Sequence, residues 1–188
     1  MVIGGDGEPF GAGFTQAEDV LIGIARRGVT FERVGIGGYP EGNPVFKTNP
    51  TEVLLRKQYL AQELGTDMEI VTQMCFDVDV LIDWITKIRQ SGVFLPVVVG
   101  VPGSLKIERL IQILPTLGIT DSLAFIKSKP KLVQSLTGGA FSGFKPNNFL
   151  KELATKSNEY LNIRGVSIYT LGNITGSVNC LTELFDES

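Results

Sequence analysis

"FERVGIGGYPEGNP", residues 31–44, joins an apolar run to a loop rich in glycine and proline. The first eight residues predict a β-strand of a sheet that is covered on both faces, because Val and Ile are frequent and polar residues do not alternate with them. The last six residues predict a loop, since glycine and proline interrupt regular structure. A helical pattern follows at 49–65, so the stretch belongs to a β-loop-helix unit.

The same unit recurs along the chain. Each of three helical patterns closes on a glycine before the next strand begins. We expect strands at residues 2–5, 31–38, 68–74, 96–101 and 165–171, and helices at 14–28, 49–65 and 77–92. A repeat of strand, loop and helix predicts a parallel sheet whose strands are joined by right-handed crossovers.

The expected helices carry recognisable start signals. Thr15 is the expected N-cap of the first helix, with Glu18 at the capping-box position. Asn49 or Thr51 is the expected cap of the second helix, and Asp77 that of the third. Each cap stands after a strand and its loop, so the signals agree with the β-loop-helix order.

Five strands in 188 residues fit two architectures, an open doubly wound sheet or a (β/α)8 TIM barrel without its first three units. A complete barrel needs roughly 250 residues. The chain starts inside a predicted strand, which favours the incomplete barrel with about five βα units. We therefore expect an α/β fold with residues 1–188 as a single domain, the C-terminal portion of a barrel, and an irregular helical insertion at about 104–161.

The composition excludes several classes of function. A net charge of −3 without a basic run argues against nucleic-acid binding. The chain contains no histidine, which rules out Ser-His-Asp and Cys-His nucleophile systems and nearly all catalytic zinc sites, and we expect no metal. Two distant cysteines indicate no disulfide framework, and no apolar run is long enough to span a membrane. We therefore expect a cytoplasmic protein.

Polar residues stand at the carboxyl ends of the expected strands. These residues are Asp6, Tyr39 with Glu41 and Asn43, Gln73, and Tyr169. In both architectures the carboxyl edge of the sheet carries the ligand. Glycines at 37 and 38 would leave room for a flat ligand, and the Tyr39 ring could stack on it. A carboxamide such as that of Gln73 can donate and accept at once, which suits a heterocycle edge.

Each of these residues also has a structural interpretation. Asp6 could belong to an ordinary β-turn, and Gln73 could cap the next helix. Arg56 and Lys57 usually indicate a solvated helix face, although they stand close enough to the Tyr39 loop to reach a phosphate. The spacing alone leaves both interpretations open.

Five segments together resemble the methylenetetrahydrofolate reductase family, in the order and near the spacing of its last five βα units. They are "VIGGD", "GGYPEGNP", "IVTQMCFDVD", "PVVVGVPGS" and "IYTLGN", and the resemblance runs from Val2 to about Leu181. It is similar to a divergent branch of the family. The resemblance implies a flavoprotein oxidoreductase of one-carbon metabolism, which uses FAD and NADH or NADPH to reduce 5,10-methylenetetrahydrofolate to 5-methyltetrahydrofolate.

The resemblance also implies site roles. Asp6, with Gly5 beside it, would lie near the flavin and the folate pterin and would be the catalytic residue, and Tyr39 would contact the flavin. Gln73 and Tyr169 would bind folate, with Gln73 also binding nicotinamide in turn. Asn43 replaces the histidine usual in the family, and Lys57 would lie near the FAD diphosphate.

One departure affects the expected activity. The resemblance implies a general-acid glutamate on the first strand of the family fold, and we expect that strand to lie outside the five units of these 188 residues. We therefore expect a partial gene product or a truncated paralogue, and for the paralogue the missing units would come from another subunit. The uncovered strand edges also lead us to expect a homo-oligomer. The alternatives are a non-catalytic folate-binding or assembly module and, less favoured, a flavodoxin-like open α/β protein.

Overall fold

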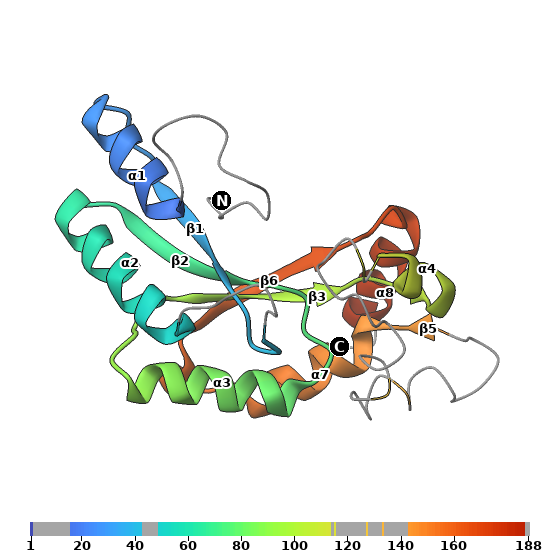
Figure 1. Ribbon diagram of the computed structural model, residues 1–188. Coiled ribbons are helices and arrows are strands. Elements are labelled where there is room, and N and C mark those ends of the chain that lie inside the picture. Colours follow the sequence, from blue (N-terminus) through green and yellow to red (C-terminus); the bar gives the residue numbers. More distant parts are fainter. Residues whose placement is uncertain are drawn as a thin grey trace.

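The computed structural model describes Met1 and residues 16–42, 49–113, 115, 127, 133 and 143–186. Its main sheet has four parallel strands, which are neighbours in chain order (Figure 1). They are β1 (Arg33–Gly38), β2 (Asp67–Thr72), β3 (Val97–Pro102) and β6 (Ile163–Tyr169). Each lies within two residues of its expected start, and the strand expected at 2–5 lies outside the described residues.

The strand order bears on the architecture. A doubly wound sheet reverses its strand order at a switch point, where the ligand binds. The four described strands show no such reversal, as expected for an arc of a barrel. The α/β class and the parallel sheet are confirmed, whereas the incomplete barrel and the single domain stay predictions.

Helices alternate with the strands along the chain. They are α1 (Ala17–Arg26), α2 (Pro50–Leu64), α3 (Val78–Gln90), α4 (Ile107–Ile113), α7 (Pro146–Lys156), the 3-10 helix η2 (Glu159–Leu161) and α8 (Ile174–Asp186). Figure 1 shows α3 and α7 along one face of the sheet. We call the opposite face, which carries Arg33, Gly37, Asp67 and Glu69, the open face, because α3 and α7 do not lie along it. Within the described part of the chain, none of these helices has the length and apolar character that a membrane span requires.

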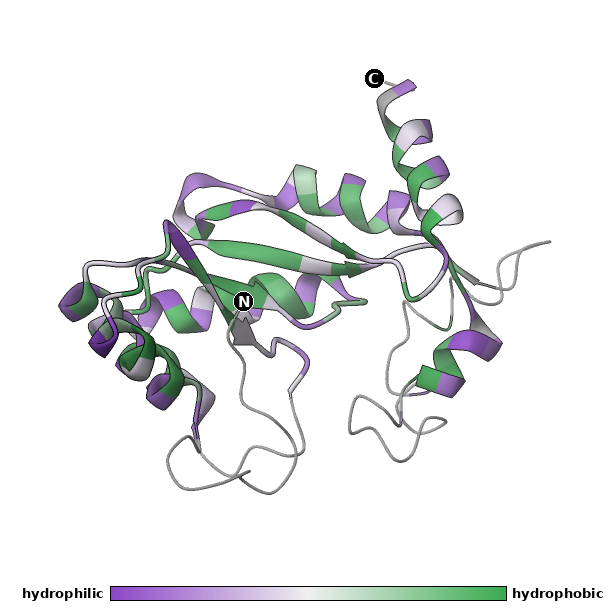
Figure 2. Ribbon diagram, turned by 90° about the horizontal axis from the view of Figure 1, so that it is seen from above, coloured by the Kyte–Doolittle hydropathy of each residue, from purple (hydrophilic) through white to green (hydrophobic). Residues whose placement is uncertain are grey.

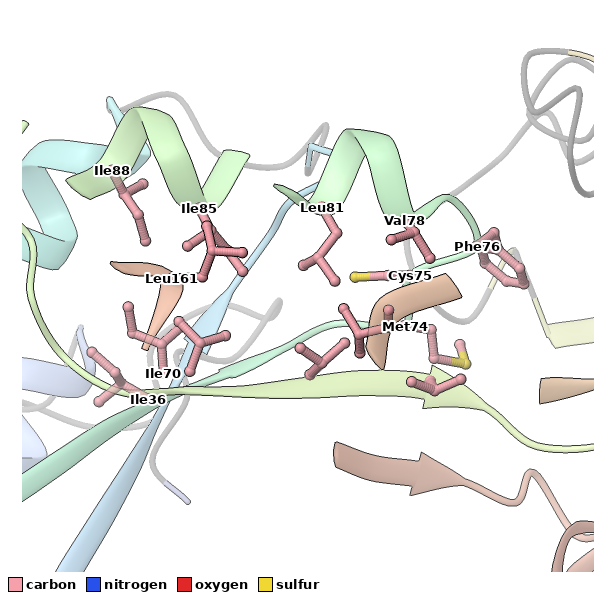
Figure 3. Close-up of a cluster of buried hydrophobic side chains, with 14 of the residues drawn as sticks. Ile36, Ile70, Met74, Cys75, Phe76, Val78, Leu81, Ile85, Ile88 and Leu161 are labelled. Carbon is pink, nitrogen blue, oxygen red and sulfur yellow. The ribbon is translucent and has the colours of Figure 1, made fainter. Parts of the chain in front are cut away.

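The core lies between the sheet and α3. Apolar side chains on α3 recur every three or four residues, so they form one stripe that faces the strands (Figure 3). The labelled residues include Val78, Leu81, Ile85 and Ile88 of α3, Ile36 of β1, Ile70 of β2 and Leu161 of η2, all of which are buried. Figure 2 shows largely hydrophobic strands, while the helices mix hydrophilic and hydrophobic residues.

The start of α1 corrects one expectation. The N-cap is Gln16 rather than Thr15, and the acid at the capping-box position is Asp19 rather than Glu18. The Gln16 backbone N–H donates to the Asp19 carboxylate at 3.0 Å. The Glu18 carboxylate is turned toward α2, with its Oε1 atom 3.9 Å from Arg56 Nη2. The prediction was wrong by one residue because Glu18 serves the packing of two helices instead of the helix start.

The caps of α2 and α3 are as expected. Asn49 Oδ1 accepts from the Thr51 N–H at 3.1 Å, which decides between the two candidates for α2. Asp77 Oδ1 accepts from the Asp79 N–H at 2.9 Å at the start of α3. Both side chains satisfy a backbone donor that the helix itself leaves unpaired. These cap hydrogen bonds therefore define the residues at which α2 and α3 begin.

The region expected to be irregular contains two short strands that were not predicted. β4 (Leu105–Lys106) and β5 (Gly143–Phe144) form a short antiparallel pair between β3 and α7. Two-residue strands carry no periodic signal, so a sequence pattern cannot reveal them. The Phe144 ring of this pair contacts the Phe76 ring edge to face, with a centroid distance of 5.6 Å.

Candidate active site at the carboxyl edge of the sheet

Three of the residues expected at the site lie at the carboxyl edge of the sheet. Tyr39 follows β1, Gln73 follows β2, and Tyr169 is the last residue of β6. Parallel strands bring their carboxyl ends to the same edge, so the topology gathers side chains that are up to 130 positions apart in the chain. All three residues are half-buried.

The open face of the sheet is lined by glycine where the two tyrosine rings lie. A Cβ atom added at Gly37 would stand 3.1 Å from the Tyr39 hydroxyl oxygen. At Gly100 an added Cβ would stand 2.7 Å from Tyr169 Cε2 and 2.3 Å from the Thr72 carbonyl oxygen. Both rings therefore fold back onto the sheet over a position without a side chain. A larger residue at Gly100 would displace the ring or the backbone.

Gly38 contradicts the expectation that it gives clearance to a ligand. An added Cβ there would stand 2.5 Å from Ile70 Cγ2 and 3.0 Å from Trp84 Cη2. Trp84 lies on α3, so Gly38 points toward the helix and permits close packing of α3 on the sheet. The space above Gly37 is occupied by the ring and hydroxyl of Tyr39. The prediction was wrong because alternate residues of a strand point to opposite faces.

A network of hydrogen bonds fixes Tyr169. The Tyr169 hydroxyl donates to the Thr72 carbonyl oxygen at 3.1 Å. The strand pairing of β2 with β3 ends at Val98, and beyond it the Gly100 N–H donates to Thr72 Oγ1 at 2.8 Å. The Gly100 carbonyl accepts from the Cys75 N–H at 2.9 Å. Side-chain and loop bonds thus replace the ladder between β2 and β3 at this edge.

The surroundings of Tyr169 keep its hydroxyl protonated. Burial raises the pKa of Tyr169, and the nearby Cys75 and Tyr39 raise it further. Loss of a proton would place a negative charge in a region of low dielectric, which disfavours the charged form. Tyr169 is therefore a hydrogen-bond donor at neutral pH.

Gln73 carries a carboxamide that is available to a ligand as far as the described residues show. Its backbone N–H donates to the Gly38 carbonyl at 2.8 Å, and its backbone carbonyl accepts from Cys75 Sγ at 3.2 Å. Its carboxamide makes no hydrogen bond within the described part of the chain. Asp77 caps α3, so the interpretation of Gln73 as a helix cap is wrong. The amide could both donate to and accept from a ligand.

Glu41 has a contact that the sequence did not reveal. Its Oε1 atom accepts from the Phe76 N–H at 2.7 Å and from the Asp77 N–H at 3.3 Å. These partners are 35 and 36 residues away in the chain. A pattern of neighbouring residues does not predict this contact. The general preference of acidic side chains for the amino end of a helix is the kind of signal that could have suggested it.

The amino end of the open face carries charge instead. Arg33 Nε lies 3.0 Å from Asp67 Oδ2 and 3.6 Å from Glu69 Oε2. Arg164 Nη1 of β6 reaches past β3 to the same two carboxylates, at 3.4 and 3.0 Å. The hydrogen bond from Arg33 lowers the pKa of Asp67. No metal-like group of three His, Cys, Asp or Glu side chains occurs among the described residues.

Comparison with known proteins places the chain in a family. The family model described as methylenetetrahydrofolate reductase matches residues 5–142. The chain belongs to the methylenetetrahydrofolate reductase family. The family fold is a TIM barrel, with which the chain-order sheet agrees. Tyr39 and Gln73 lie inside the matched range, and Tyr169 lies beyond it.

Two curated relatives carry the same family name. Methylenetetrahydrofolate reductase 2 of Saccharomyces cerevisiae is 34% identical over 95 residues, which cover 50% of this chain and 15% of that protein. Methylenetetrahydrofolate reductase 1 of Schizosaccharomyces pombe is 32% identical over 90 residues, which cover 48% of this chain and 14% of that protein. The matched part of the chain thus spans about one seventh of these relatives.

The remaining expected site residues of this methylenetetrahydrofolate reductase family member are Gly5, Asp6, Asn43 and Lys57. Gly5, Asp6 and Asn43 lie outside the described residues. Lys57 lies on α2 and is 8% exposed. Burial lowers the pKa of Lys57, while Glu18 of α1 raises it. Lys57 is therefore buried at the contact of α1 with α2, and the structure does not bring it into the group formed by the other residues.

Proposed function

We propose that this chain acts in the FAD-dependent reduction of 5,10-methylenetetrahydrofolate to 5-methyltetrahydrofolate. One observation supports the proposal. Tyr39, Gln73 and Tyr169 lie at the carboxyl edge of the parallel sheet in a chain of the methylenetetrahydrofolate reductase family. The overall reaction consumes one NADH or NADPH and one proton. The hydride becomes part of the new methyl group, and the proton is taken up by the folate nitrogen released when the five-membered ring opens.

The chemistry of the described residues fits a flavin and a pterin. Two aromatic rings lie over glycine positions, and such rings can stack on flat ligands. One carboxamide beside them is available to form hydrogen bonds. When bound, FAD would supply the two-electron carrier between nicotinamide and folate. Tyr39 would contact its ring system, Gln73 would bind nicotinamide and folate in turn, and the neutral Tyr169 hydroxyl would face the folate.

The residues outside the described part complete the same proposal. Gly5 and Asp6 would lie near the flavin and the pterin, and Asn43 would supply a neutral hydrogen-bonding group. Lys57 is left out of the diphosphate contact, because its ammonium group is buried beside α1. The proposal therefore assigns the phosphates no partner among the described residues.

The test is an activity assay on the purified chain with FAD. Oxidation of NADH or NADPH is followed with menadione as acceptor and then with 5,10-methylenetetrahydrofolate. We expect activity with both acceptors, and we expect Gln73→Ala to lose most of the folate-dependent rate. Gln90→Ala is the matched control, since Gln90 is an exposed glutamine at the far end of α3. Equal rates for the two variants would contradict the role of Gln73.

A second candidate is a folate-binding or assembly module without catalysis. The observation that favours it is Glu41, whose carboxylate is engaged with two backbone N–H groups and so is not placed to protonate a substrate. This candidate predicts a thermal shift with tetrahydrofolate but no oxidation of NADH or NADPH. A homo-oligomer is part of either proposal. β6 is an edge strand of the described sheet with Val166 43% exposed, and light scattering would measure the mass.

A further inference from the structure

Glu41 joins two loops of the carboxyl edge. The first loop is the turn Tyr39–Gly42, in which the Gly42 N–H donates to the Tyr39 carbonyl at 3.1 Å and Gly42 has a φ of 84°. The second loop carries Gln73 and leads into α3. The Glu41 carboxylate accepts from the Phe76 N–H and the Asp77 N–H of this second loop. One side chain thus connects the segments that carry Tyr39 and Gln73.

We propose that Glu41 is a positioning residue that holds the Tyr39 turn at a fixed place relative to Gln73. This inference rests on the proposed function of the carboxyl edge as a ligand site. Hydrogen bonds from backbone N–H groups to a carboxylate are charge-assisted, and they are stronger than those between neutral groups. The partly positive start of α3 favours an anion at the same place.

The second loop is a firm anchor for this contact. Phe76 is 5% exposed, and its ring packs against Phe144 of β5. The Gln73 N–H also donates to the carbonyl of Gly38, the residue before Tyr39. The two loops are therefore joined at both sides of Tyr39, once through the backbone and once through Glu41.

A simple helix-capping role for Glu41 explains less of the geometry. Asp77 already caps α3 through the Asp79 N–H. The shorter of the two Glu41 contacts goes to Phe76, which precedes the N-cap and lies outside the helix. The contact to Phe76 therefore serves the loop and not the helix.

Amide exchange measured by NMR without any ligand separates the two roles. The Gly42 N–H reports on the Tyr39 turn, and the Leu81 N–H, which bonds to the Asp77 carbonyl, reports on the start of α3. For Glu41→Ala we expect exchange at Gly42 to rise about tenfold or more, with a smaller change at Leu81. The matched control Asp77→Ala removes the true cap and should show the reverse pattern. Equal acceleration of Gly42 in both variants would overturn the proposal.

A binding measurement extends the test to the ligand. We expect Glu41→Ala to weaken the affinity for FAD about tenfold, Glu41→Gln to recover part of it through its remaining carbonyl oxygen, and Asp77→Ala to change it less than twofold. Unchanged FAD affinity in Glu41→Ala would contradict positioning of a ligand residue. If the unmodified chain takes up no FAD, the proposed function fails, while the exchange experiment still decides whether Glu41 holds the turn.

Discussion

The two ends of the open face differ in how their polar groups are used. At the amino end two arginines and two carboxylates satisfy one another in a four-residue network. At the carboxyl end two tyrosine rings lie over glycine, and the Gln73 carboxamide has no partner within the described part. The paired charges at the amino end leave few hydrogen-bonding groups for a ligand. The available amide at the carboxyl end can form new hydrogen bonds with a ligand that stacks on the rings. The comparison supports the proposal that the sheet serves stability at its amino end and ligand recognition at its carboxyl end.

The largest expected effect comes from filling the glycine under Tyr169. In Gly100→Ala the new Cβ would meet the Thr72 carbonyl oxygen at 2.3 Å, and a backbone atom cannot move aside cheaply. We expect a loss of about 3 kcal/mol in the free energy of unfolding, measured by urea denaturation, together with loss of ligand binding. Gly165→Ala is the control, because nothing lies within 4 Å of its added Cβ. A change below about 0.5 kcal/mol for Gly100→Ala would contradict the geometry.

A smaller effect is expected from the Tyr169 hydroxyl. Tyr169→Phe keeps the ring but removes the donor to the Thr72 carbonyl oxygen. One hydrogen bond contributes about 1 kcal/mol, so the free energy of unfolding should fall by about that amount. Tyr59→Phe serves as control, since Tyr59 is 61% exposed on α2. Equal urea midpoints for the two variants would show that the hydroxyl does not tie β6 to β2.

The smallest effect is expected at the amino end. Arg33 lowers the pKa of Asp67, so this carboxylate stabilises the folded state at pH values above its unfolded pKa of about 4. The contribution is lost as the pH falls through the lower folded value. In Arg33→Gln the stability should therefore fall less steeply between about pH 4 and pH 2, as measured by thermal unfolding in low salt. A matching change in FAD affinity would contradict separate roles for the two ends, because the amino end would then affect the site.

Much of the fold was predictable from local pattern. Runs of Val and Ile place the strands within two residues, and short polar side chains such as Asn49 and Asp77 mark the helix starts. These signals depend on residues next to one another in the chain. The two-residue strands β4 and β5 have no such signal, and their pairing comes from tertiary contact.

The site was predictable in part. Tyr39, Gln73 and Tyr169 could be predicted from their positions at the ends of expected strands. Parallel topology alone brings such strand ends to one edge of the sheet. The face of the sheet toward which Gly38 points depends on the position of β1 in the folded sheet. In the structure Gly38 points toward α3 and not toward the open face. The Glu41 contact depends on the distance between two loops that are 35 residues apart. Such pairings follow from the folded backbone and not from spacing in the sequence.

The most direct test of the recognition end is a titration of the chain with FAD, followed by flavin fluorescence. We expect saturable quenching in the unmodified chain, clearly weaker binding in Tyr39→Ala, and unchanged binding in Tyr59→Ala, whose tyrosine lies exposed on α2. Absence of FAD uptake by the unmodified chain, or equal affinity of the two variants, would contradict the claim that the carboxyl end of the open face is a flavin site.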